Sequence, residues 1–273
     1  MISEYLPQTA NNFESLLHRK EYKAPKRLVY GNLSAHLREG VYKMDSVVSF
    51  GQDSIELFDN LIEKLHRLPT PKEYISEGLV IMENYWKENR HTNKKIGGYP
   101  FNKGVKLGCA DRLLRTYISF IVEIHLQLLL KEKGFKVCEH PLIDSIMGVD
   151  LIAENHKKRY YIHVTTSKRG EGGSIQSVKH KEKRGLFLFG GEWHNYSRDF
   201  SGDVVLHYPQ KAVGGMAKEV NNLILLEKEY LDFFFDLKDI SSKHGEPLGR
   251  PSKLLRFNEW TRAALNIDVM EEL

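Results

Sequence analysis

The sequence predicts a mixed α/β (α+β) protein, and three observations carry this prediction. Helical periodicity dominates the N-terminal third, a long apolar helix follows near the middle of the chain, and short β-type segments cluster after that helix. From residue 112 onward the expected order is helix, three strands, helix and strand. Two of these strands are joined by the short polar turn at 154–159, so an antiparallel hairpin is expected inside a mixed sheet.

Length and composition limit the class of protein. A chain of 273 residues can form one large domain or a core with a substantial appendage. Its 41% hydrophobic and 28% charged residues are typical of a packed globular protein. No run approaches the roughly 18 apolar residues of a membrane span, and the N-terminus lacks the pattern of a signal peptide. Cys109 and Cys138 fit neither a zinc module nor a disulfide framework. These features predict a cytoplasmic protein that does not contact a membrane.

The N-terminal third contains two clear helical patterns. Apolar residues recur at helical spacing across 52–68, after the potential cap Asp53. A second helix is expected from Pro71 to about residue 90, with the proline in its first turn. The segment 92–104 is rich in glycine and basic residues, which predicts a loop and a boundary between two regions.

The rest of the chain alternates strands and helices. Residues 112–133 give the longest helical signal, and Gly134 is expected to end that helix. Strands are then expected at 135–139, 148–153, 160–168, 186–189 and 203–208, and helices at 174–183 and 216–238. The glycine-rich turn 170–173 lies before a helix, where it could cradle a phosphate of DNA.

Positive charge is concentrated in one part of the sequence. Between residues 156 and 184 there are nine Lys or Arg and two Glu, a net charge of +7. The whole chain carries +4, so the remainder sums to −3. Such a concentration favours a polyanionic partner, with nucleic acid as the first choice. A solvated basic face is the alternative explanation.

Three segments in order resemble the core of the PD-(D/E)XK nuclease superfamily, which includes many type II restriction endonucleases. The first is Glu123 on a helix that runs into the sequence KGFKV at 133–137. The second is the strand GVDLIA at 148–153, and the third is the strand at 160–167. The resemblance covers about 50 residues. It implies a restriction-endonuclease-like fold, in which helices flank a mixed sheet.

The resemblance assigns roles to individual positions. Asp150 corresponds to the metal-binding aspartate and Glu123 to the helix glutamate. His163 stands where the family has Glu, Asp or Gln, and Thr165 stands where it has lysine. Alternate side chains of a strand share a face, so His163 and Thr165 would lie on the same face as the family's acidic residue and lysine do. Their side chains, however, differ in chemistry from those two residues. The candidates to supply the missing positive charge are Lys168 and, from the helix expected next, Lys179 or Lys181.

The implied site therefore has three overlapping groups of residues. The catalytic candidates are Glu123, Asp150, His163, Thr165 and Lys168. The metal candidates are Glu123, Asp150 and His163, which would hold Mg²⁺ to polarise a phosphate and activate water. The DNA-binding candidates are Lys168, Arg169, Lys179, Lys181, Lys183 and Arg184.

Each candidate also has a purely structural interpretation. Asp150 could simply end a strand of a hairpin, and Glu123 could form a buried ion pair with Arg112 or Arg115. His163 could be an ordinary hydrogen-bonded strand histidine, and Thr165 is a good β-former.

Taken together, the resemblance implies a prokaryotic, cytoplasmic, Mg²⁺-dependent type II restriction enzyme that cuts double-stranded DNA at specific sequences. Residues 1–105 would form a mainly helical region for DNA recognition and dimerisation, and residues 106–273 the catalytic core with a C-terminal helical extension. A homodimer would match the two-fold symmetry of palindromic DNA. No phosphate-binding loop or dinucleotide motif occurs, so no nucleotide cofactor is expected.

Two other functions remain open from the sequence. A DNA-binding protein on a degenerate nuclease core would explain why the usual glutamate and lysine are missing. A repair or resolvase-type nuclease would use the same core on branched or damaged DNA.

Overall fold

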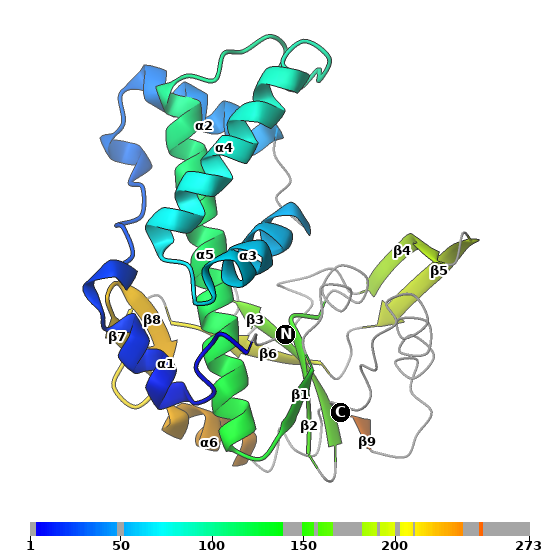
Figure 1. The fold of residues 1–273 in the computed structure, drawn as a ribbon. Coiled ribbons are helices and arrows are strands. Elements are labelled where there is room, and N and C mark those ends of the chain that lie inside the picture. Colours follow the sequence, from blue (N-terminus) through cyan, green and yellow to red (C-terminus); the bar gives the residue numbers. More distant parts are fainter. Residues whose placement is uncertain are drawn as a thin grey trace.

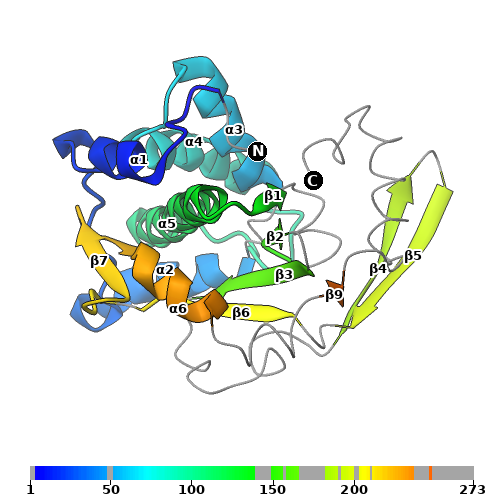
Figure 2. The same cartoon turned by 90° about the horizontal axis from the view of Figure 1, so that it is seen from below.

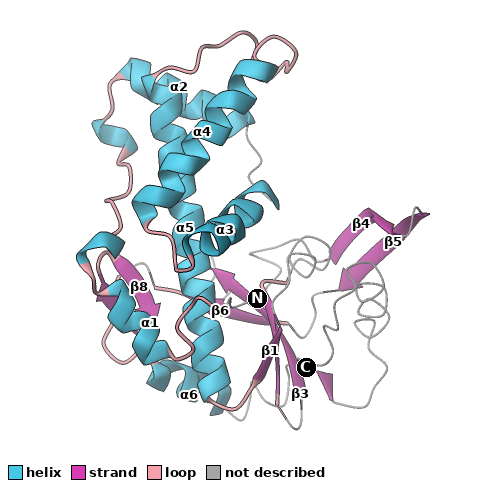
Figure 3. Cartoon of the chain, viewed as in Figure 1, coloured by secondary structure: helices cyan, strands magenta, loops and turns pink. Residues whose placement is uncertain are grey.

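The computed structural model describes residues 4–47, 52–138, 149–155, 158–165, 182–189, 192–199, 203–209, 211–236 and 246–247. Figure 3 shows helices stacked along one long axis, with the main sheet beside the lower half of that stack. The predicted mixed α/β class, with a small mixed sheet and flanking helices, is confirmed.

Helix α5 (Lys103–Glu132) runs through the middle of the molecule (Figure 1). It begins well before the expected residue 112, because the side chain of Asn102 accepts a hydrogen bond from Val105 N and caps the first turn. Gly134 follows the helix with φ +84°, which confirms the predicted glycine stop. At 1.5 Å per residue the helix is about 45 Å long.

The length and hydropathy of α5 would also suit a membrane span. Among the described residues it is the one helix that meets both criteria, and 67% of its apolar window is buried inside the protein. Helices α1, α2 and α4 and strands β1 and β8 all pack on it. The apolar surface of α5 thus belongs to a core that the rest of the chain covers.

The N-terminal helices confirm the two periodic patterns read from the sequence. Helix α1 spans Ala10–Leu17 and α2 spans Ala35–Val47, while α3 (Gln52–Leu65) and α4 (Pro71–Asn89) match the predicted helices. Two short 3-10 turns, η1 (Lys20–Tyr22) and η2 (Tyr30–Asn32), lie between α1 and α2.

A capping box fixes the start of α4. The hydroxyl of Thr70 accepts from Glu73 N, and the Glu73 carboxylate accepts from Thr70 N at 2.7 Å. Arg67 binds both oxygens of that carboxylate, at 2.6 and 3.0 Å. Hydrogen bonds from Arg67 lower the pKa of Glu73 to about 2, so the carboxylate stays charged in this cap.

Helices α2 and α5 pack so closely where they cross that their backbones are in contact. A Cβ placed on Gly104 would lie 2.6 Å from Leu37 O, and one on Gly40 would lie 2.7 Å from Val105 N. Because these contacts are with backbone atoms, no side-chain rotation can relieve them. Glycine at positions 40 and 104 is therefore what allows the two helices to pack this closely.

The main sheet has the order β1-β2-β3-β6, and β9 also pairs with β3. Its strands are β1 (Lys136–Cys138), β2 (Leu151–Glu154), β3 (Lys158–Thr165), β6 (Val204–His207) and β9 (Glu246–Pro247). β2 and β3 form the predicted antiparallel hairpin, whereas β3 and β6 are parallel. The sheet is therefore mixed, as the sequence predicted.

One face of this sheet packs against α5. Alternate residues of the strands belong to the same buried cluster as the helix, among them Leu151 and Ala153 of β2, Ile162 of β3, and Leu206 of β6. Figure 2, which looks along α5, shows the sheet lying beside that helix. The intervening residues of each strand must point to the opposite face.

The predicted helix at 216–238 is wrong over its first half. Residues there form the hairpin of β7 (Ala217–Val220) and β8 (Leu223–Leu226), and only α6 (Lys228–Asp236) is helical. Asn221 and Asn222 make the two-residue turn, with φ values of +50° and +67°. Asparagine tolerates this left-handed region, so this pair was a hairpin signal within an otherwise apolar stretch.

A second hairpin occupies part of the basic region. β4 (Glu182–Phe189) pairs with β5 (Glu192–Asp199), and neither pairs with any other strand in the described parts of the chain. The strand expected at 186–189 is confirmed within β4. The helix expected at 174–183 lies mostly outside the described residues, and its last two positions belong to β4.

An ion-pair network attaches α1 to the core. The Glu14 carboxylate contacts buried His125 Nε2 of α5 at 2.9 Å and Lys218 Nζ of β7 at 2.5 Å. Burial opposes ionisation of Glu14, but the hydrogen bonds from His125 and Lys218 hold its pKa below the ordinary value. Glu14 thus links α1 to both α5 and the β7–β8 hairpin.

Gly104→Ala should destabilise the protein by about 2 kcal/mol, although alanine normally favours a helix over glycine. The added methyl group would collide with the backbone of α2, and urea unfolding would measure the loss. Gly214→Ala is the control, because nothing lies within 4 Å of a Cβ there. Equal stability of the two variants would contradict this account of the α2–α5 crossing.

Candidate functional site

Asp150 lies directly before β2 and is bound to the middle of β3. Its backbone N donates to Ile162 O at 3.1 Å, and its Oδ2 accepts from Val164 N at 2.5 Å. These bonds place Asp150 beside His163, the residue between those two partners. The carboxylate therefore takes the place of a backbone acceptor at the end of the β2–β3 ladder, while the side chain remains half-buried.

His163 forms a buried pair with an aspartate of the next strand segment. Its Nε2 lies 2.7 Å from Asp203 Oδ2, and both side chains are almost completely inaccessible to solvent. Asp203 directly precedes β6, which pairs with β3 in parallel so that His163 is opposite Val205. An aspartate that binds one ring nitrogen fixes the orientation of the imidazole and leaves Nδ1 as its second functional atom.

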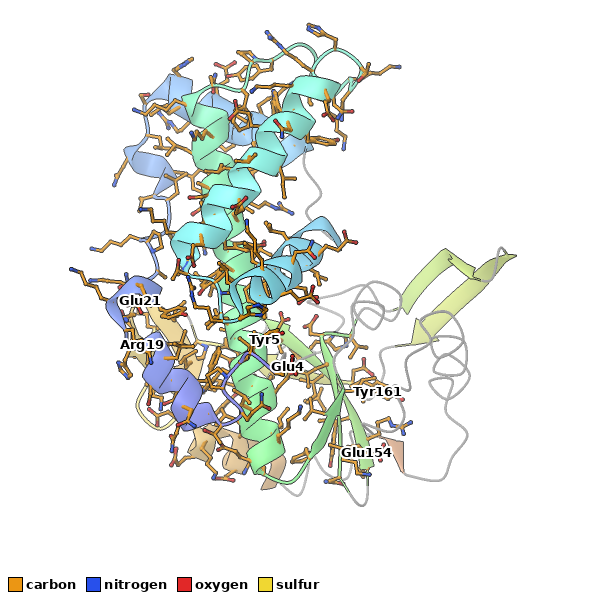
Figure 4. All side chains as sticks on the ribbon, in the orientation of Figure 1. Glu4, Tyr5, Arg19, Glu21, Glu154 and Tyr161 are labelled. Carbon is orange, nitrogen blue, oxygen red and sulfur yellow. The ribbon has the colours of Figure 1, made fainter. Side chains whose placement is uncertain are left out.

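These groups gather on the face of the sheet that points away from α5. Ile162 and Val204 face the helix, so His163 and Asp203 face the other side. Tyr161 and Ile152 are also buried, outside the α5 cluster. Figure 4 shows Tyr161, two residues before His163 on the same face, together with Glu154 on the sheet side of the molecule.

Glu123 lies on the helix side of the sheet. Its Oε1 accepts from Ser119 Oγ at 3.1 Å within α5. The neighbouring Val122 O accepts from the hydroxyl of Tyr208, whose pKa is raised by burial and, in smaller part, by the charge of Glu123. The structure therefore brings Asp150, His163 and Asp203 together around β3 but places Glu123 with Tyr208. Arg115, a predicted alternative partner of Glu123, forms ion pairs with Asp111 and Asp45.

The described residues supply only part of a metal shell. Among them, no group of three or more His, Cys, Asp or Glu side chains is arranged to hold a metal ion. Magnesium, however, is commonly held by one or two carboxylates, with water and substrate phosphate completing the shell. Asp150 is the half-buried carboxylate that fits this role, and His163 is buried next to it.

The remaining candidates fall at or beyond the limits of the described chain. Lys168, Arg169, Lys179 and Lys181 lie outside the described residues. Thr165 is the last residue of β3, paired in register with His207, and Lys183 and Arg184 belong to β4. Their predicted roles therefore stay predictions.

Asp203 is not among the site residues predicted from the sequence. A signal was present, because an acidic residue precedes an apolar strand in GDVVL at 202–206, just as it does in GVDLI at 148–152. What the sequence does not show is the parallel pairing of β3 with β6. That pairing brings Asp203 next to His163 from 40 residues away.

Comparison with known proteins finds no match to this chain. No family model matches the chain, and neither a curated protein nor a solved structure is similar enough to count as a match. Any assignment of function therefore has to rest on the residues themselves.

Asp203→Ala should destabilise the protein by about 2 to 4 kcal/mol, because it leaves buried His163 without its carboxylate. Asp203→Asn should cost less, since the amide oxygen can still accept a hydrogen bond. Urea unfolding would measure both. The control is Glu83→Gln in the surface pair Glu83–Lys87, which should leave stability unchanged. An Asp203→Ala protein as stable as the wild type would show that the pair does not hold His163 in place.

Proposed function

We propose that this chain is a Mg²⁺-dependent endodeoxyribonuclease of the type II restriction kind, which hydrolyses phosphodiester bonds in double-stranded DNA. The observation that carries the proposal is the placement of Asp150 beside His163 on adjacent strands. These are the two strand positions at which the resemblance to PD-(D/E)XK nucleases expects metal-binding groups. The basic segment that follows β3 provides the charge to attract DNA.

Asp150 would be the protein carboxylate that binds Mg²⁺. Its Oδ2 is engaged by Val164 N, which holds the carboxylate in a fixed orientation at the end of β2. When bound, the ion would polarise the phosphate and lower the pKa of a water molecule. In the reaction, a water oxygen bonds to phosphorus and loses a proton, while the bond to the leaving sugar oxygen breaks and that oxygen gains a proton.

His163 would orient the attacking water or receive its proton through Nδ1. Its contact with Asp203 would hold the ring in place for this transfer. The pairing of a histidine with a carboxylate thus substitutes for the glutamate expected at this position. Lys168 would stabilise the charge that develops on the phosphate, as the family's lysine does from a position two residues after its acidic residue.

A second candidate function is non-catalytic DNA binding on a nuclease-like core. It is favoured by the position of Glu123 beside Tyr208, across the sheet from His163. It is also favoured by Thr165, which cannot supply the positive charge of the usual lysine. This candidate predicts salt-sensitive DNA binding without cleavage.

Asp150→Asn should reduce Mg²⁺-dependent cleavage of plasmid DNA by more than the roughly 10- to 100-fold that loss of an outer-shell partner costs. The amide keeps an oxygen for Val164 N, so the fold and DNA binding should be retained. Glu88→Gln, which removes an exposed carboxylate of α4, is the matched control and should cut normally. Gel analysis of the plasmid products and a mobility-shift assay would measure cleavage and binding.

The outcomes separate the candidate functions. Discrete fragments from the wild type, lost in Asp150→Asn, would support a restriction-type nuclease. Cleavage that survives the substitution would show that the site is assigned to the wrong residues. DNA binding without any cleavage by the wild type would favour the DNA-binding protein, and cleavage of branched or damaged DNA alone would favour a repair enzyme.

A further inference from the structure

A second group of basic residues lies in the N-terminal part of the chain. We call residues 19–27 the basic strap. It carries five basic side chains and one acidic side chain, and all six are exposed to solvent; they are Arg19, Lys20, Lys23, Lys26, Arg27 and Glu21. Its first turn is η1, and residues 23–29 form no helix or strand, with extended backbone angles at Lys23 and Val29. Lys20, Lys23 and Lys26 follow one another at intervals of three residues.

The strap is held to the body of the protein at its centre and at its C-terminal end. At its centre, Ala24 N donates to Asn221 O at 3.0 Å and Ala24 O accepts from Asn222 Nδ2 at 2.6 Å. At its end, the buried carboxylate of Asp111 accepts from Leu28 N at 2.9 Å and also contacts Arg27. A backbone fixed in this way presents its lysines without paying the ordering entropy of a free loop.

Tyrosine side chains continue this surface beyond the strap. The ring of Tyr30 stacks on that of Tyr42 from α2, with centroids 6.4 Å apart and planes inclined by 17°. Tyr42 is 61% exposed, and Val29, which precedes Tyr30 in the sequence, is 59% exposed. Burial and then the charges of Asp45 and Asp111 raise the pKa of Tyr30, while Arg115 and Arg27 lower it in smaller part, so both acidic and basic groups lie near this ring.

We infer that the basic strap and the Tyr30–Tyr42 pair form a binding surface for single-stranded nucleic acid. Lysines along a fixed backbone suit a flexible phosphate chain, and an exposed tyrosine offers a face on which an unpaired base can stack. A duplex keeps its bases stacked on one another, so the exposed ring would add nothing to its binding.

This surface is separate from the candidate nuclease site. Figure 4 places Arg19 and Glu21 on one side of α5, and Tyr161 and Glu154 of the sheet on the other side. Figure 2 shows the same separation, with α1 and the sheet on different sides of α5. Binding at the strap therefore does not require the nuclease proposal to be correct.

The lysines can be tested with a charge-matched pair of variants. Lys20→Glu/Lys23→Glu/Lys26→Glu should weaken binding of fluorescein-labelled oligothymidine at least tenfold in the presence of EDTA, measured by fluorescence anisotropy. If each lysine neutralises one phosphate, the slope of log K against log salt should fall by about 2. Lys94→Glu/Lys95→Glu/Lys103→Glu changes the net charge equally, on exposed lysines of the α4–α5 connection and at the first residue of α5, and should bind nearly as the wild type does.

Three results would overturn the lysine part of this inference. They are an equal loss in both triple variants, no binding of oligothymidine by the wild type at low salt, and strap-dependent binding to phosphatidylserine vesicles but not to the oligonucleotide. Thermal melting of each variant would show that it is folded.

The tyrosines can be tested in the same assay. Tyr42→Ala should weaken oligothymidine binding roughly fivefold or more, whereas Tyr42→Phe, which keeps the ring, should not. Neither change should alter binding to a duplex. Tyr85→Ala, at a tyrosine of α4 that is 41% exposed, is the control. Equal effects of Tyr42→Ala on single strands and duplexes would contradict a stacking role.

Discussion

The burial of α5 on all sides is the constraint on which the rest of the structure depends. From Ile121 to Leu130 every residue except Glu123 is buried, so this third of the helix has no face that can remain in water. A helix that is apolar all round needs neighbours all round. The chain meets this requirement with α1, α4 and β8 and with one face of the main sheet. Nearer the N-terminus of α5, α2 packs closely on it at Gly40 and Gly104.

The same constraint divides the sheet into two chemically different faces. Because the apolar side chains of β2, β3 and β6 pack against α5, the residues that alternate with them point away from the helix. Those residues include His163 and Tyr161, and Asp203 follows the same alternation at the start of β6. Polar groups on this second face bind each other, as His163 and Asp203 do, because an unpaired buried polar group is costly.

The sequence was sufficient where local chemistry determines the element. The start of α4 could be predicted because Thr70, Pro71 and Glu73 form a complete capping signal, and Gly134 marked the end of α5 for an equally local reason. The β2–β3 hairpin could be predicted because two apolar segments flank a short polar turn. The resemblance to the nuclease family assigned Asp150 and His163 to one site, and the register of this hairpin places the two residues side by side.

The sequence was insufficient where distant segments decide the outcome. Residues 217–226 are apolar enough to suit a helix, and only the left-handed turn at Asn221 and Asn222 favours the hairpin that forms. Asp203 becomes part of the site through the parallel pairing of β3 and β6, which no local sequence pattern predicts. The side of the sheet on which Glu123 lies depends on the orientation of α5 about its own axis. Hydrophobic periodicity cannot predict that orientation, because nearly every residue next to Glu123 is apolar.

The turn at Asn221 and Asn222 also sets an order of events during synthesis. Its side chains bind the carbonyls of Leu17, Arg19 and Ala24, which precede it by some 200 residues. At 5 to 20 residues per second a ribosome needs about 10 to 40 s to cover that distance. For all of this time the carbonyls of Leu17, Arg19 and Ala24 lack these side-chain partners. The segment 17–24 can therefore complete its hydrogen bonds only long after it has left the ribosome.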